Sequence, residues 1–232
     1  MRSGPELREL SAEQFTTELD ALTGIYALAM DAPAAELPGR MSIMERYAGY
    51  PAFHAVVAIL PGAPGGPGAS AAGVRGGPGG RGHGQDRDED ATGSQRALIG
   101  FAYGFHGSAG QWWHDVVRKS LTAQHGGEVA DRWLGDSFEF AEVHMRPEHQ
   151  GRGTGRAMMH ALAGGRPERT AVLSTPDGQT RARRLYQSLG FVDLLPAFSF
   201  PGAGPSYTIM GAVLPLPDEP PLAARLASPS RW

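Results

Sequence analysis

The chain has 232 residues, a formal net charge of −3 and no cysteine. This length predicts one domain with a sizeable core, and the small net charge gives no reason to expect nucleic acid or an anionic membrane as a partner. The lack of cysteine excludes disulfides, thiolate catalysis and cysteine-ligated zinc; because no stretch approaches the ~20 apolar residues of a membrane span and residues 1–10 lack the apolar centre of a secretory signal, we expect a cytoplasmic protein.

The first third of the chain predicts two helices and a strand. Apolar residues at helical spacing predict a helix over 14–29, and Ser11 followed by Gln14 is typical of a capping box at its start. A second, short helix is predicted over Met41–Ala48. The Val-, Ile- and Ala-rich segment Phe53–Leu60 predicts a strand.

The segment 61–96 differs in composition from the rest of the chain. Of its 36 positions, 12 are Gly and 4 are Pro, and Val74 is its only larger aliphatic residue. Such a segment offers too little apolar surface to offset the entropy of ordering, so we expect a disordered insertion between two strands of a hairpin. A docking arm that uses its arginines is the alternative to a solvated insertion without a role.

Strands and helices alternate over the rest of the chain. Helical spacing predicts helices, and β-branched or apolar runs predict strands, over the following segments: strand Arg96–Phe105, helix Gln111–Leu134, strand Phe138–Met145, helix Thr154–Leu162, strand Thr170–Ser174, helix Thr180–Leu189, strand Phe191–Leu195 and strand Tyr207–Leu214. The order predicts an α/β (α+β) fold with helices on both faces of a sheet. We expect a single domain over 1–214, and a Pro-rich tail over 215–232 that is extended or disordered.

A glycine-rich turn follows the strand that ends at Met145. Gln150 begins the pattern Q-x-x-G-x-G, which ends at Gly155 and leads directly into a helix. Glycines let the backbone approach a ligand closely, and a helix N-terminus leaves amide groups free to bind a phosphate. The pattern lacks the Gly-Lys-Ser/Thr of a P-loop, and its glycine spacing does not fit the dinucleotide fingerprint G-x-G-x-x-G.

This turn, with Pro147 before it, resembles the acyl-CoA loop of the GNAT superfamily of N-acyltransferases. A second motif, A-x-x-x-Y-x-x-x-G-F from Ala182 to Phe191, is similar to that family's later helix and turn. The resemblance covers about residues 138–195. It implies a GNAT-like mixed, mostly antiparallel central sheet, whose two central strands splay apart to admit the cofactor.

The resemblance implies that acetyl-CoA is the co-substrate and that this region binds it. The backbone of the strand would pair with the pantetheine arm like a neighbouring strand, and the loop amides, helped by two arginine side chains, would hold the pyrophosphate. The expected cofactor-binding residues are Val143, His144, Met145, Gln150, Gly151, Arg152, Gly153, Thr154, Gly155 and Arg156. The loop before the second motif helix lacks the Asn that the family often has there.

Three residues are candidates for the acid–base chemistry. Family members often place the tyrosine that matches Tyr186 near the thioester sulfur as the general acid. Glu139 and Glu142 lie on the strand before the loop, where family bases are often found. In a regular strand they face opposite sides, and only a bulge would bring them together. The alternatives are structural or solvated roles, or a base that acts through water.

Three tryptophans are candidates for an acceptor pocket. Trp112, Trp113 and Trp133 fall where the family fold often carries substrate-covering insertions, although a satellite core is the plainer interpretation. No paired histidine spacing indicates a metal site.

The leading function hypothesis is an N-acetyltransferase that moves the acetyl group from acetyl-CoA to a primary amine by direct attack in a ternary complex. The alternative is a non-catalytic acyl-CoA-binding sensor or structural module. The acceptor is open between a small-molecule amine and a peptide or protein amine, and a homodimer is left open too. Binding of nucleic acid or protein through Arg181, Arg183 and Arg184 is a third hypothesis, but such a cluster is usually a solvated helix face.

Overall fold

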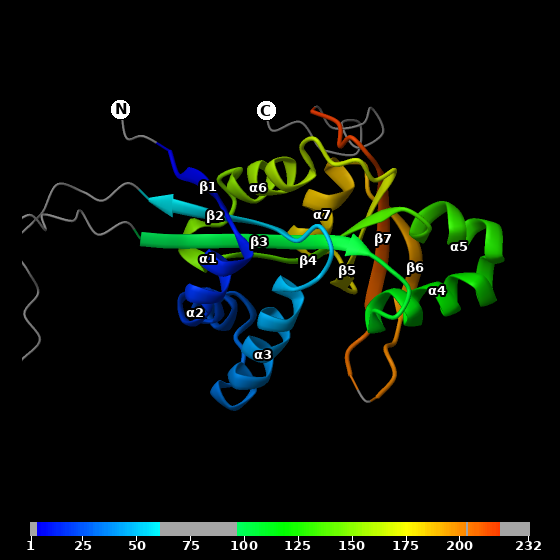
Figure 1. Cartoon of the computed structure of the whole chain (residues 1–232), viewed down its shortest axis with the longest axis horizontal. Coiled ribbons are helices and arrows are strands. Elements are labelled where there is room, and N and C mark those ends of the chain that lie inside the picture. The colour runs from blue at the N-terminus through cyan, green and yellow to red at the C-terminus, as the bar shows by residue number, and fades with distance from the viewer. Residues whose placement is uncertain (1–3, 61–96, 203, 219–232) are drawn as a thin grey trace, which may run out of the picture.

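The computed structural model describes residues 4–60, 97–202 and 204–218. The expected insertion at 61–96 and the end of the expected tail lie outside the described residues. Seven strands form one sheet in the order β1-β2-β3-β4-β5-β7-β6 (Figure 1). The strands are β1 Glu6–Leu10, β2 His54–Leu60, β3 Ala97–Gly107, β4 Ser137–Met145, β5 Thr170–Pro176, β6 Val192–Phe198 and β7 Tyr207–Val213.

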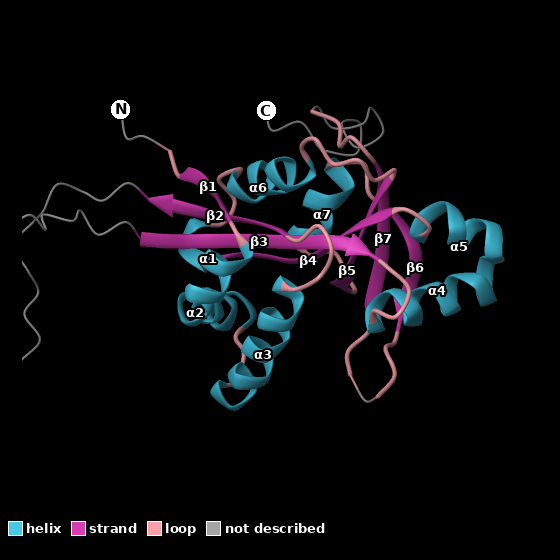
Figure 2. Cartoon of the chain, viewed as in Figure 1, coloured by secondary structure: helices cyan, strands magenta, loops and turns pink. Residues whose placement is uncertain are grey.

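Helices cover both faces of this sheet (Figure 2). They are α1 Ala12–Thr17, α2 Leu19–Met30, α3 Leu37–Ala48, α4 Trp112–His125, α5 Gly127–Leu134, α6 Thr154–Ala163 and α7 Arg181–Ser188. Helices α1 to α3 pack on one face, α6 and α7 on the other, and α4 with α5 packs beside β5 and β7. Val56 and Val57 show why one sheet serves two cores: successive side chains of β2 point to opposite faces and join different clusters.

The two central strands separate part of the way along their length. Every neighbouring pair in the sheet is antiparallel except β4 and β5, which are parallel. Their pairing begins at Ser137 with Thr170 and ends at Glu139 with Val172, although both strands continue beyond these residues. The backbone groups of the remaining length are therefore unpaired across a gap between the strands, as the family resemblance implies.

A bulge in β4 changes which side chains share a face. Tyr103 of β3 pairs with Glu142, whereas the next residue, Gly104, pairs with Phe140, so Ala141 is an extra residue. A Cβ at Gly104 would collide with the Glu139 carbonyl oxygen and the Phe138 ring, so glycine permits the close approach of the two strands. The extra residue removes the opposite parity, and both glutamates lie on the face that carries α1 to α3.

Several predicted boundaries need correction. The helix expected over 14–29 is two helices, α1 and α2, that meet at Glu18. The helix expected over Gln111–Leu134 breaks at Gly126, whose φ of 90° is a conformation that favours glycine. The Ser11–Gln14 capping box is confirmed.

Both ends of the described chain are more ordered than expected. Strand β1 was not predicted, because it is a charged edge strand in which Leu10 alone is buried. The tail expected to start at Pro215 instead continues the fold, since Leu216 packs into the core on the α6 face.

Candidate active site

The gap between β4 and β5 opens into a cleft of about 1250 Å³. One end is formed by the glycine-rich loop with the N-terminal turns of α6 and α7. The other end is formed by α2, α3, the start of α4 and the loop between β6 and β7. The volume exceeds the ~1000 Å³ upper range of ordinary small-ligand sites, so the cleft has room for two reactants.

The glycine-rich loop has the conformation that an anion site requires. Gly151 and Gly153 have φ values of 76° and 87°, and α6 begins at the next residue, Thr154. No side chain caps this helix, so its first amide groups stay open to the cleft. The Gln150 side chain donates to the Met145 carbonyl oxygen (3.1 Å) and braces the loop against the end of β4.

The arginines around the loop differ from the expectation. Arg156 lines the cleft, but the Arg152 guanidinium donates back to the Glu148 carbonyl oxygen (3.1 Å) and does not line it. Arg181 and Arg184, interpreted from sequence as part of a solvated face, do line it. The Arg181 Nη1 lies 3.9 Å from where a Cβ of Gly151 would be. Cations in the first turn of a helix are unfavourable beside its dipole. Two arginines at such a position were therefore the one sequence signal that an anion binds here.

The two glutamates line the same cleft but have different surroundings. Glu139 is 4% exposed, and its Oε2 has no hydrogen-bond partner among the described residues. Burial raises the pKa of Glu139 to about 8. Glu142 instead accepts a hydrogen bond from the Arg40 guanidinium (2.8 Å) and is in direct hydrogen-bond contact with His144.

Tyr186 lines the cleft from the α7 side, opposite β4. It is 8% exposed, and its ring packs at a tilt against Phe191 with centroids 5.9 Å apart. Burial, and then the charge of Glu142, raise the pKa of Tyr186. The phenol therefore keeps its proton and can donate it within the cleft.

The tryptophans separate into two groups. Trp112 and Trp113 line the cleft, and Trp112 stacks on Phe200 of the β6–β7 loop with centroids 5.4 Å apart. Trp133 does not line it: its ring packs on Gly211 of β7, because the face of α5 that carries it covers the sheet. The expectation that Trp133 walls an acceptor pocket is therefore corrected to a packing role.

Sequence reasoning missed the aromatic and basic residues that α2, α3 and the turn after α3 bring to the cleft. They are Tyr26, Arg40, Arg46, Tyr47 and Tyr50. These residues are far from the motifs in sequence, and no local pattern distinguishes them from the ordinary surface of an amphipathic helix.

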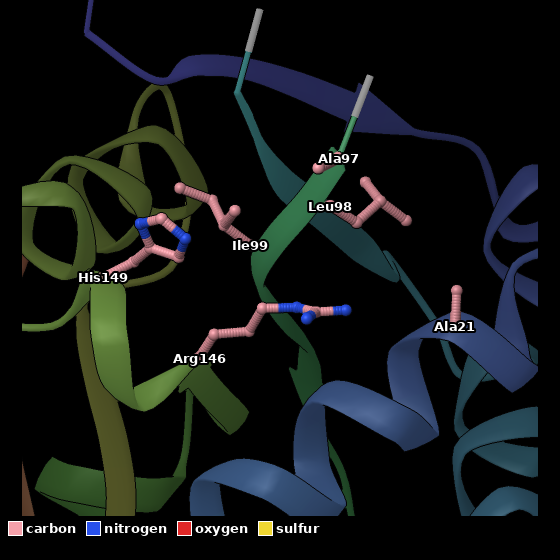
Figure 3. A pocket seen from close by; sticks show the side chains of 6 residues that line it. All are labelled: Ala21, Ala97, Leu98, Ile99, Arg146 and His149. Carbon is pink, nitrogen blue, oxygen red and sulfur yellow. The ribbon is translucent and has the colours of Figure 1, made fainter. Parts of the chain in front are cut away.

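A second, smaller pocket of about 300 Å³ lies beside the end of β4. Figure 3 shows Arg146 extending from that end toward Ala21, with His149 next to Ile99. No glycine of the loop and no candidate acid or base lines this pocket. The larger cleft is therefore the candidate active site.

Two further features bear on ligands. Among residues 4–60, 97–202 and 204–218, no three His, Asp or Glu side chains come together as a metal site requires. In the same described segments, no helix is long and apolar enough to cross a membrane.

A family model and a curated relative match this chain. The model described as "Acetyltransferase (GNAT) domain" matches residues 110–193. A GCN5-like protein acetyltransferase of Mycobacterium tuberculosis is 39% identical over 127 residues, which are 53% of this chain and 62% of the relative. The chain thus matches less than two thirds of that relative's length.

Solved structures share the fold. Arabidopsis thaliana NAA60 in complex with a bisubstrate analogue has a TM-score of 0.52 at 13% identity, covering 90% of this chain and 99% of that one. An acetyltransferase from Thermus thermophilus has a TM-score of 0.50 at 14% identity, covering 92% and 99%. Residues 110–193 thus match a GNAT acetyltransferase domain, and the splayed strands and the glycine-rich loop agree with this match.

Proposed function

We propose that the protein transfers the acetyl group of acetyl-CoA to a primary amine by direct attack within a ternary complex. One observation carries this proposal: a single cleft joins an anion-binding loop to a buried carboxyl, Glu139, and a buried phenol, Tyr186. Holding two reactants together in such a cleft can lower the activation free energy by about 7 to 11 kcal/mol.

Acetyl-CoA is the co-substrate of the GNAT family, and it supplies an activated thioester with a pyrophosphate for anchorage. The residues present fit that ligand. The amides of Gly151 to Arg156 would hold the pyrophosphate, with Arg156, Arg181 and Arg184 adding charge. The backbone of Val143 and Met145, which is not paired with β5, would hydrogen-bond the pantetheine arm as a neighbouring strand would.

The acid–base roles follow from the two environments. Glu139, with its raised pKa, accepts the proton that the amine nitrogen loses on forming the amide. Tyr186 donates a proton to the departing thiolate. Glu142, bound by Arg40, has a supporting role rather than that of the base.

The acceptor is a primary amine, and we favour one on a peptide or protein. The mycobacterial relative carries the name of a protein acetyltransferase, which supports this class. Aromatic residues at the acceptor end, including Trp112, Tyr47 and Tyr207, suit the apolar stem of an amine-bearing side chain. A small-molecule amine is the second candidate for the acceptor. We also propose that the protein is cytoplasmic.

Thiol release from acetyl-CoA with a panel of peptide and small-molecule amines tests the proposal. Saturable release that depends on the amine is expected; binding of acetyl-CoA without any release would instead identify a sensor.

Substitution in the loop tests the cofactor site. Gly153→Glu places a side chain and a like charge at the pyrophosphate, so calorimetry should show acetyl-CoA affinity lowered by at least about 100-fold. Gly153→Asn is the matched control, because Asn tolerates a positive φ and carries no charge. Equal affinity in the two variants would refute this site.

A further inference from the structure

Four residues from three elements form a closed ring of contacts at the acceptor end of the cleft. The Arg40 guanidinium of α3 donates to Glu142 of β4 (2.8 Å) and to the Tyr26 hydroxyl of α2 (3.1 Å). Glu142 contacts the Nε2 of His144, and the His144 ring meets the Tyr26 ring edge-on at 5.2 Å. All four residues line the cleft.

The contacts indicate which ring nitrogen of His144 carries the hydrogen. A carboxylate that is ion-paired with Arg40 only accepts hydrogen bonds, so the Nε2 of His144 carries the hydrogen. In a neutral imidazole the other nitrogen, Nδ1, then has a free lone pair. Among the described residues, the one side-chain hydrogen bond of His144 is made by Nε2 and none is made by Nδ1.

The closed ring of four residues is largely buried. The side chains of Glu142 and His144 are 12% and 10% exposed, and that of Arg40 is 31% exposed. The titratable groups that face this unit are Tyr26 from α2, Arg40 and Tyr47 from α3, Tyr103 from β3, and Glu139 and Tyr186 within the cleft. Burial raises the pKa of Tyr103 well above its ordinary value, so this neighbour stays neutral.

Amide formation from an ammonium group releases two protons from nitrogen. The first must leave before the amine can attack, and the second leaves as the amide forms. The thiolate takes up one proton, so one proton in total is released. Glu139 is assigned above to the second of these protons, so the first needs an acceptor of its own if the amine arrives as an ammonium ion.

We propose that His144 is the acceptor of the first proton, with Glu142 orienting its ring and Arg40 positioning Glu142. This inference rests on the proposed acetyl transfer. The ammonium N–H bond breaks, Nδ1–H forms, and the imidazolium charge is balanced by Glu142 until the proton passes to solvent. The neutral amine then attacks the thioester, Glu139 takes the second proton and Tyr186 gives one to the thiolate. Proton exchange through solvent then returns one proton from Glu139 to Tyr186, so that one proton in total is released.

The kinetic test compares two acceptors in a thiol-release assay. Phenethylamine is an ammonium ion at neutral pH, whereas its β,β-difluoro analogue is largely neutral and needs no first proton transfer. His144→Gln should lower kcat/KM for phenethylamine about 100-fold, the scale of general-base catalysis, and lower it less than about 3-fold for the difluoro analogue. Equal losses for both amines would overturn the proposal, and His125→Gln, at the exposed end of α4, is the matched control.

A second test needs no acceptor and separates this inference from the acetyl transfer itself. Long-range ¹H–¹⁵N NMR of the full chain, with the His144 signals assigned by His144→Gln, should show the Nε2–H tautomer. Arg40→Gln should reduce that tautomer's share, and Arg40→Lys should restore most of it. An Nδ1–H tautomer in the wild type, or one insensitive to Arg40, would overturn the proposal; absence of thiol release with every amine would refute the acetyl transfer alone.

Discussion

At the scale of single residues, Glu139 and Glu142 lie in different environments, and these environments support the roles that we propose for them. The bulge at Ala141 places both on one face of β4, yet Glu139 is held without a cation and Glu142 is held by Arg40. Two carboxyl groups on one strand can therefore differ in chemical behaviour because their surroundings differ.

Replacing Glu139 tests its role through pH. Because burial raises the pKa of Glu139 to about 8, wild-type kcat/KM should rise as pH increases through about 8, where the carboxyl becomes ionised. Glu139→Gln should lower kcat about 10²- to 10⁴-fold and remove this rise. The rise must be measured with an acceptor whose own amine does not titrate in that range.

The same substitution has a stability signature. A folded-state pKa raised above the unfolded value contributes stability at low pH that is lost as pH rises from about 4.5 to about 8. Thermal unfolding should therefore show Glu139→Gln gaining on the wild type as pH rises across this window. A pH-independent difference between the two proteins would contradict the buried, unpaired state of Glu139.

Tyr186 is tested by removing only its hydroxyl. Tyr186→Phe keeps the ring that packs against Phe191, so the fold should lose no more than about 1.5 kcal/mol of unfolding free energy. We expect kcat to fall about 10- to 1000-fold with little change in the KM for acetyl-CoA. Wild-type kcat in this variant would leave Tyr186 a packing residue and transfer the acid role to water.

At the scale of elements, an ion-pair junction ties the loop after α6 to the sheet. Arg166 donates to Glu168 (3.0 Å) and to the Ala52 carbonyl oxygen (3.2 Å), and it lies 4.3 Å from the Phe138 ring centroid. Glu168 also contacts His106 near the end of β3 (3.2 Å). The junction thus holds β5, which begins two residues after Glu168, beside β4 at the end where the two strands are paired.

Removing the charge of Glu168 should weaken the fold. Glu168→Gln leaves the guanidinium of Arg166, 11% exposed, without its partner, so we expect a loss of about 3 kcal/mol in unfolding free energy near neutral pH. Burial alone would raise the pKa of Glu168, but hydrogen bonds from Arg166 and His106 outweigh it and lower the pKa.

The lowered pKa fixes the direction of the pH dependence. Glu168 contributes to the free energy of unfolding above its ordinary pKa of 4.5, and this contribution is lost as pH falls through the lower folded pKa. The unfolding free energies of the wild type and Glu168→Gln should therefore converge in acid. Glu148→Gln is the control, because its exposed pair with Arg146 spans 4.0 Å and should contribute less than about 1 kcal/mol. Equal losses in the two variants by chemical denaturation would contradict the junction's role.

At the scale of the whole molecule, we propose one domain that extends at least to Leu216 and in which the segment 61–96 is an insertion. Leu60 and Ala97, the residues on either side of it, are register partners in the β2–β3 hairpin. The chain therefore needs only a short turn to connect them, and loop-closure entropy favours the shorter connection.

Replacing 61–96 by a short Gly/Ser turn should thus preserve the fold. The thermal midpoint should stay equal or rise by a few degrees, and acetyl-CoA affinity should change less than about 2-fold. Calorimetry and circular dichroism on the two proteins check this. A loss of cooperative unfolding would mean that the segment contributes to the core.

The sequence by itself determined the order of most elements and the nature of the loop. The spacing of apolar residues located the strands and helices, because burying one face of an element requires apolar residues at regular intervals in the sequence. The glycines before Thr154 indicated an anion site, since backbone conformation and helix termini are local properties. The edge strand β1 escaped this reasoning because it buries little apolar surface.

Only the tertiary structure decided which side chains meet. Parity alone separated Glu139 from Glu142, and a bulge set by pairing with β3 joined them. Arg40 bonds to Glu142 although the two residues are 102 positions apart in the sequence. The Trp133 ring lies against Gly211 of β7 and not in the cleft, because the face of α5 that carries it packs on the sheet. Such contacts depend on the packing of distant elements, and no local pattern carries information about a partner that folding brings near.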